Sequence, residues 1–155
     1  MPKSPNDPKM AVEKLLESEP DQLFEELGLR KSAMLAEPHR AGAFDSDATF
    51  DAPFAGPLEF MGDIGRRFFE RINRDVYDLV CGTDSANATE RKVILESMNL
   101  GETMFATTLV GAIVSTFGIA PTLATVVAAL VVRLFFKDAY TATCDVWKEH
   151  LPKVT

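Results

Sequence analysis

Thirty consecutive residues, from Thr103 to Val132, contain no charged side chain, and a Gly-Ile-Ala-Pro step at 118–121 interrupts them near the middle. A run this apolar must be removed from water, and the glycine and proline favour a turn over one continuous helix. We therefore expect an antiparallel hairpin of two long helices, at about 89–117 and 122–150. Each helix has a polar outer half and an apolar half next to the turn.

Apolar side chains elsewhere recur at helical spacing, and no segment alternates with the period of a strand. Residues 58–80 form the clearest amphipathic pattern, because apolar side chains recur every three or four residues and Arg and Asp occupy the other face. The expected fold is all-α. It is a small helical bundle built on the hydrophobic hairpin, with the amphipathic helix at about 58–80 and a short N-terminal helical arm.

Composition divides the chain into three parts. Residues 1–30 form an acidic arm of two short helices, the second of which is expected to end at Gly28. Residues 31–57 are rich in Ala, Gly, Pro, Asp and Ser without a sustained period, which predicts a flexible linker. Residues 58–155 form the helical body with the hydrophobic hairpin tip. The apolar side of the arm predicts a surface that docks on a partner, formed by Leu15, Leu16, Leu23, Phe24 and Leu27.

Small side chains line up at a spacing of four on both halves of the hairpin. The first row is Thr107, Gly111 and Ser115, and the second is Ala120, Ala124 and Ala128. Rows of small residues let two helix backbones approach closely. We expect the two rows to form the packing contact of the hairpin.

The length of the apolar halves does not decide whether the hairpin is buried in a membrane or in a protein core. Each half has about 15–16 residues, or about 22–24 Å of helix, whereas a membrane span needs about 20 residues. Basic residues stand on both sides of the run, at Arg91 and Lys92 before it and at Arg133 and Lys137 after it. That arrangement fits a membrane hairpin with both ends in the cytoplasm. Burial in a protein core is the alternative.

The net charge of −7 is concentrated at the start of the chain, where residues 1–57 hold eleven acids and six bases. An acidic chain is a poor binder of nucleic acid, because phosphate neutralisation needs clustered Lys and Arg. No nucleic-acid partner is therefore predicted. The N-terminus is polar and Pro-rich and lacks the apolar core of a secretory leader. The expected location is the cytoplasm or the cytoplasmic face of the inner membrane, not secretion.

Two cysteines, Cys81 and Cys144, lie 63 residues apart in predicted helices. Neither belongs to a C-x-x-C motif. Their apolar neighbours favour two free thiols that behave as small hydrophobic side chains, and a disulfide between them is the less favoured alternative.

The motifs that could indicate chemistry lack their required context. Asp45-Ser-Asp47-Ala-Thr49 matches the D-x-D-x-T string of aspartate-nucleophile phosphatases, but no strand–helix–strand unit surrounds it. His39 and His150 do not stand at metal-ligand spacing from Cys or acidic residues. We predict no catalytic residue, no metal site, no cofactor and no small-molecule substrate.

Two functions fit these patterns. The first is a non-enzymatic, membrane-associated helical-hairpin protein that perturbs a membrane as an effector or tethers a cytoplasmic partner to a lipid bilayer. The alternative is a soluble all-α interaction module that buries the hairpin by oligomerisation or in a complex. Both predict a protein partner or a homo-oligomer, because one amphipathic helix and a short arm would leave a large apolar patch uncovered.

Overall fold

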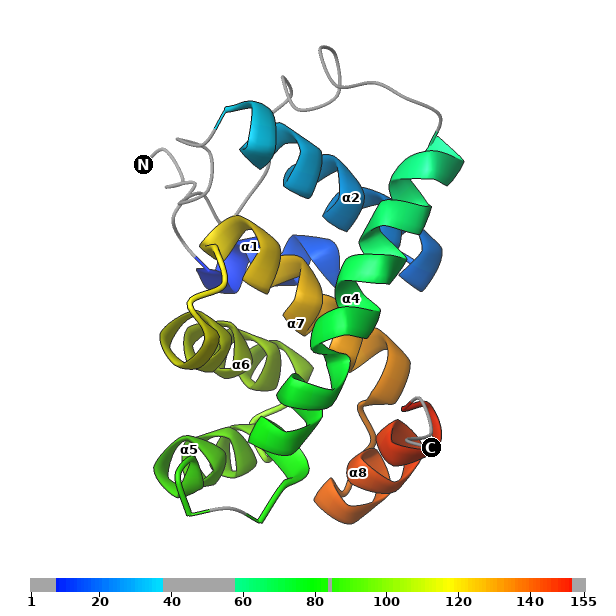
Figure 1. The fold of residues 1–155 in the computed structure, drawn as a ribbon. Coiled ribbons are helices and arrows are strands. Elements are labelled where there is room, and N and C mark those ends of the chain that lie inside the picture. Colours follow the sequence, from blue (N-terminus) through cyan, green and yellow to red (C-terminus); the bar gives the residue numbers. More distant parts are fainter. Residues whose placement is uncertain (1–7, 38–57, 84, 152–155) are drawn as a thin grey trace, which may run out of the picture.

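The computed structural model describes residues 8–37, 58–83 and 85–151, and within them the chain forms seven α-helices and no strand (Figure 1). The all-α fold expected from the sequence is confirmed. In chain order the helices are α1 (Pro8–Leu15), α2 (Pro20–Ala36), α4 (Leu58–Cys81), α5 (Ala88–Met98), α6 (Glu102–Phe117), α7 (Pro121–Phe135) and α8 (Tyr140–Glu149). The amphipathic helix expected at 58–80 is α4.

Helix α7 runs through the centre of the molecule (Figure 1). Twelve of its fifteen residues are buried, from Thr122 to Val132 without interruption and again at Phe135. Helices α1, α2, α6 and α8 all pack against it. A helix that is hydrophobic all round needs cover on every side, and here the same chain provides that cover for the second half of the uncharged run.

The two long helices expected for the hairpin are each divided in two. The first breaks between α5 and α6, where Gly101 has a φ of 105°, a backbone conformation that side-chain-bearing residues rarely adopt. The second breaks after Phe136, whose backbone is extended. The hydroxyl of Thr143 then accepts a hydrogen bond of 2.9 Å from the backbone N–H of Lys137, so a side chain of α8 stabilises the break.

The turn between α6 and α7 lies where the sequence places it. Gly118 follows α6 with a φ of 66°, and Pro121 begins α7. A left-handed glycine after the last helical turn and a proline at the first position of the next helix are the usual devices for such a junction. The two helices joined by this turn pack against each other.

Gly28 does not end a helix, contrary to the sequence-based expectation. It lies inside α2, buried against α4, and α2 continues to Ala36. A Cβ atom on Gly28 would overlap the backbone carbonyl of Met61, and one on Gly65 would overlap the carbonyl of Phe24. Two glycines thus permit α2 and α4 to cross with their backbones in contact, because neither helix places a side chain between them.

Arg30 connects α2 to the start of α7. Its side chain is 1% exposed, its Nε lies 2.8 Å from the carboxylate of Glu26, and its guanidinium donates a 3.1 Å hydrogen bond to the carbonyl of Thr122. A buried charge is tolerated when it is paired and hydrogen-bonded. The N-terminal helices are therefore joined to the central helix by a polar contact as well as by apolar packing.

Candidate functional site

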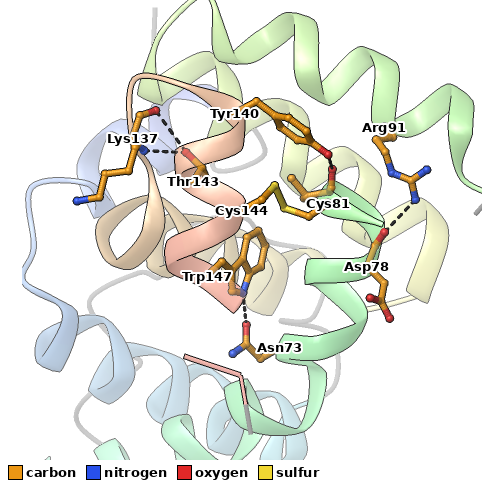
Figure 2. Close-up of a disulfide and its surroundings, with 10 residues drawn as sticks. Asn73, Asp78, Cys81, Arg91, Lys137, Tyr140, Thr143, Cys144 and Trp147 are labelled. Carbon is orange, nitrogen blue, oxygen red and sulfur yellow. Dashed lines mark hydrogen bonds between the residues drawn. A yellow bond between two sulfur atoms is a disulfide. The ribbon is translucent and has the colours of Figure 1, made fainter. Parts of the chain in front are cut away.

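A disulfide between Cys81 and Cys144 joins the last residue of α4 to α8 (Figure 2). The two Cα atoms are 5.8 Å apart, which is within the range that a disulfide can span. The interpretation of both cysteines as free thiols is wrong, because the fold brings two residues 63 positions apart into direct contact. Both cysteines are partly exposed.

Trp147 of α8 fills the space beside the disulfide and is fully buried (Figure 2). Its indole N–H donates a 2.7 Å hydrogen bond to the side-chain oxygen of Asn73 on α4, which is 5% exposed. Its ring stacks on Phe135 with centroids 5.1 Å apart, and Tyr77 meets it edge-on at 5.6 Å. The packing of α8 against α4 and α7 is centred on this one side chain.

Tyr140, at the start of α8, forms a second polar contact with the end of α4. Its hydroxyl donates a 2.9 Å hydrogen bond to the carbonyl of Val80, next to the disulfide. Burial raises the pKa of Tyr140 above the usual value of a tyrosine, and the nearby Arg91 guanidinium partly opposes that shift. The phenol therefore stays protonated, and able to donate this bond, throughout the neutral pH range.

Asn73 allows a direct test of this junction. Replacing Asn73 with leucine leaves the buried indole N–H of Trp147 without its acceptor, which costs about 1–3 kcal/mol of unfolding free energy. Chemical denaturation followed by circular dichroism measures this loss. The control is the same substitution in a Trp147→Phe background, where no N–H remains to be left unpaired and the penalty should be smaller. An equal penalty in both backgrounds would show that this hydrogen bond does not stabilise the protein.

A second feature is a groove of about 300 Å³ between α5 and α6. Its lining contains one charged residue and is otherwise uncharged, comprising Thr89, Glu90, Val93, Ile94, Thr108, Gly111, Ala112 and Ser115. Val93 is 50% exposed, and Leu100, in the turn between the two helices, is 68% exposed. Val93 on α5 and Leu100 in the following turn thus present apolar side chains to the surroundings.

The two rows of small residues lie in different environments. Ala124 and Ala128 on α7 are fully buried and Ala120 is partly buried. On α6 the row faces outward: Gly111 and Ser115 are exposed, and a Cβ atom on Gly111 would meet no other atom within 4 Å. The buried side of α6 consists instead of Phe105, Ala106, Leu109, Val110, Ala112 and Ile113.

Two hydroxyl groups on α6 bond within their own helix. Thr107, which is partly buried, donates a 2.7 Å hydrogen bond to the carbonyl of Thr103. Ser115 donates a 3.3 Å hydrogen bond to the carbonyl of Ala112. These contacts satisfy the side chains locally, so the packing of α6 on the core is carried by its larger apolar residues.

The residues expected to dock the arm on a partner pack against the body of this chain. Leu15, Leu23 and Leu27 belong to the same buried cluster as α6 and α7, and Leu16 and Phe24 pack against it from the side. Phe24 also meets Phe69 of α4 edge-on, with ring centroids 5.7 Å apart. The arm therefore covers part of the hairpin and forms part of the core.

Within the described ranges, no group of three or more His, Cys, Asp and Glu side chains could hold a metal ion. His150 is exposed at the end of α8, with Nδ1 2.9 Å from the carbonyl of Val146. His39 and the Asp45–Thr49 string lie outside the described residues. No helix in the part of the chain that the structure describes is long and apolar enough to cross a membrane.

The features that distinguish this site were not predicted from the sequence. No local spacing indicated the Cys81–Cys144 pair, because the two residues lie 63 positions apart in different helices. The local sequence pattern did not indicate that Val93 and Leu100 are exposed, because both lie in a segment of mixed polarity. Comparison of the chain with protein-family models, with curated proteins and with solved structures found no match.

Proposed function

We propose that the protein is a non-enzymatic interaction domain that binds a helix of a protein partner in the groove between α5 and α6. The observation that carries the proposal is the exposure of Val93 and Gly111 on the two walls of an almost uncharged groove. Binding of a helix in an apolar groove is a common mode of peptide recognition. The partner helix would present apolar side chains to Val93 and its backbone to the Gly111 side.

Gly111 is the feature that favours a helix as the occupant. A Cβ atom there would meet nothing within 4 Å, so the backbone of α6 is open to close approach. Small residues at such positions allow helix backbones to come together. The α7 half of the uncharged run is already covered by its own chain, so the outer side of α6 is the part of the run left for a partner.

The proposal is tested by photo-cross-linking from position 93 in cells. Val93 is replaced by the photoreactive residue p-benzoylphenylalanine, and the adducts are identified by mass spectrometry. Adding Gly111→Arg places a long charged side chain in the groove and is expected to abolish the adduct while the protein stays folded. Thr141→Arg, at an exposed position of α8, is the control and should leave the adduct unchanged.

Two results would contradict the proposal. One is an adduct that survives Gly111→Arg, and the other is the absence of any reproducible protein adduct from position 93. Light scattering at increasing protein concentration then distinguishes the sources of the helix. If the helix belongs to a second copy of this chain, the molar mass should rise toward that of a dimer, and Gly111→Arg should return it to that of a monomer. If the helix belongs to a different protein, the isolated protein should stay monomeric.

Membrane association is the second candidate function. The observation that favours it is the α6–α7 turn, where Gly118 is exposed, Phe117 and Ile119 are partly exposed, and no charged residue lies nearby in the sequence. An uncharged turn can enter the interface of a bilayer without desolvating a charge. Co-sedimentation with anionic vesicles tests this function, and Ile119→Asp should abolish binding if the turn is the contact. Unchanged binding, or none by the wild-type protein, would exclude this turn as a membrane anchor.

We propose the cytoplasm, or the cytoplasmic face of the inner membrane, as the location. In a reducing compartment a disulfide is usually transient and serves catalysis or redox sensing. The Cys81–Cys144 bond is therefore best tested as a bond that forms and opens during the life of the protein.

A further inference from the structure

We propose that the Cys81–Cys144 disulfide is a redox latch that holds α8 on the body and releases it when a dithiol reduces the bond. This inference rests on the junction of α4, α7 and α8 and is independent of the groove between α5 and α6. The attacking thiolate of the dithiol forms a mixed disulfide with one cysteine sulfur and releases the other as a thiolate. The second thiol of the reductant then resolves the mixed disulfide, so the protein gains two electrons and two protons and the reductant becomes a disulfide.

Reduction of the disulfide requires that a thiol can approach it. Cys81 and Cys144 are both partly exposed, although the tryptophan beside them is fully buried. Access of the attacking thiol is one of the factors that set the rate of thiol–disulfide exchange. We therefore expect a small dithiol to reach the bond without prior unfolding of the core.

Apart from the disulfide, helix α8 is held in place by the contacts of Tyr140, Thr143 and Trp147. It is ten residues long, and only Thr143 and Trp147 within it are buried. An isolated helix shorter than about 12–15 residues is marginal in water. With the disulfide closed, Cys144 cannot move away from the end of α4, and the remaining contacts of α8 re-form after every fluctuation. With the bond open, they must hold the helix alone.

Most of the packing around α7 comes from helices other than α8. Helix α7 keeps the cover of α1, α2 and α6, and α8 packs on it near Phe135, at the opposite end from Arg30. Local opening of one terminal element while the core stays folded is a common property of proteins. Release of α8 would uncover Phe135, which is 3% exposed in the latched form, and present a new apolar surface.

Trp147 reports the position of α8 because it is the only tryptophan in the chain. The experiment uses the full-length protein, oxidised or treated with dithiothreitol, with free thiols counted to confirm that two have appeared. On reduction we expect the Trp147 emission to shift to longer wavelength and its quenching by acrylamide to increase. In hydrogen-exchange mass spectrometry, residues 140–149 should exchange at least about tenfold faster, whereas α7 should keep its protection.

The Cys81→Ser, Cys144→Ser double variant is the matched control, which should resemble the reduced protein and no longer respond to dithiothreitol. Three outcomes would each overturn the latch. Trp147 could stay shielded after two thiols appear, which would show that α8 does not need the bond. Loss of protection in α7 together with α8 would show that the disulfide stabilises the whole fold and not α8 alone. Failure of dithiothreitol to reduce the native protein would show that the sulfurs are inaccessible.

Discussion

Replacing Gly28 with alanine is expected to lower the free energy of unfolding by about 3 kcal/mol, the upper end of the usual cost of overpacking. The added methyl group would overlap the carbonyl oxygen of Met61 and lie 2.7 Å from its carbonyl carbon. Backbone atoms of a helix cannot rotate out of the way as a side chain can. Gly65→Ala should have a similar effect, because its methyl group would overlap the carbonyl oxygen of Phe24 in the same crossing. Thermal and denaturant unfolding measure both.

Gly111→Ala is the matched control for these two variants. It is the same chemical change inside a helix, but at an exposed position where the new methyl group meets no atom within 4 Å. Alanine is a better helix former than glycine by about 0.5–1 kcal/mol, so this variant should be slightly more stable than the wild type. Equal losses of unfolding free energy in all three variants would show that the methyl groups added at Gly28 and Gly65 do not clash across the α2–α4 crossing.

Replacing Leu27 with alanine is expected to destabilise the protein by about 2–5 kcal/mol, the range for removing a buried leucine side chain. Leu27 is fully buried in the common core, although it belongs to the N-terminal segment that resembles a separate arm in the sequence. The loss combines the transfer of apolar atoms to water with the cavity left behind. Denaturant unfolding monitored by far-ultraviolet circular dichroism measures it.

Leu35→Ala is the control for this prediction. Leu35 lies in the same helix, eight residues further on, and is 71% exposed. A surface substitution of this kind usually changes stability by no more than about 0.5 kcal/mol. If Leu27→Ala and Leu35→Ala have the same small effect, the first two helices are an appendage and not part of the core. The pair of variants therefore decides whether residues 8–36 can be removed without loss of the fold.

A substitution at Gly111 can test the proposed function without disturbing the packing of α6 on α7. If the small row on α6 joined it to α7, a large side chain at Gly111 would force the helices apart. The structure places this residue at the surface instead, so Gly111→Arg can block the groove without disturbing the core. Stability and binding can then be measured on the same variant: binding should be lost, whereas stability should not fall.

Several parts of the fold could be predicted from the sequence because they depend on nearby residues. The amphipathic spacing over 58–80 gives the length of α4, since a helix repeats every 3.6 residues whatever it packs against. Gly118 and Pro121 locate the turn between α6 and α7, because both residues restrict or permit particular backbone angles locally. The uncharged run likewise identifies the segment that supplies most of the buried residues of α6 and α7.

Periodicity shows which side of a helix is apolar but does not identify what will cover it. From the sequence we therefore expected lipid or a second subunit to cover the hairpin. In the structure, helices α1 and α2 from the N-terminal part of the same chain cover α7. The role of Gly28 changed for the same reason. A glycine near the end of an apolar stripe looks like a helix stop, and only the position of Met61 shows that it permits a crossing.

By itself, the sequence determined that this protein is helical, where its longest amphipathic helix lies, and which thirty residues supply much of the buried core. The tertiary structure decided that Cys81 meets Cys144, that Trp147 meets Asn73, and that Arg30 reaches Thr122, at separations of 63, 74 and 92 residues. Helical periodicity is a property of a few consecutive turns. Contacts between residues this far apart depend on the packing of the whole chain, so no local pattern encodes them.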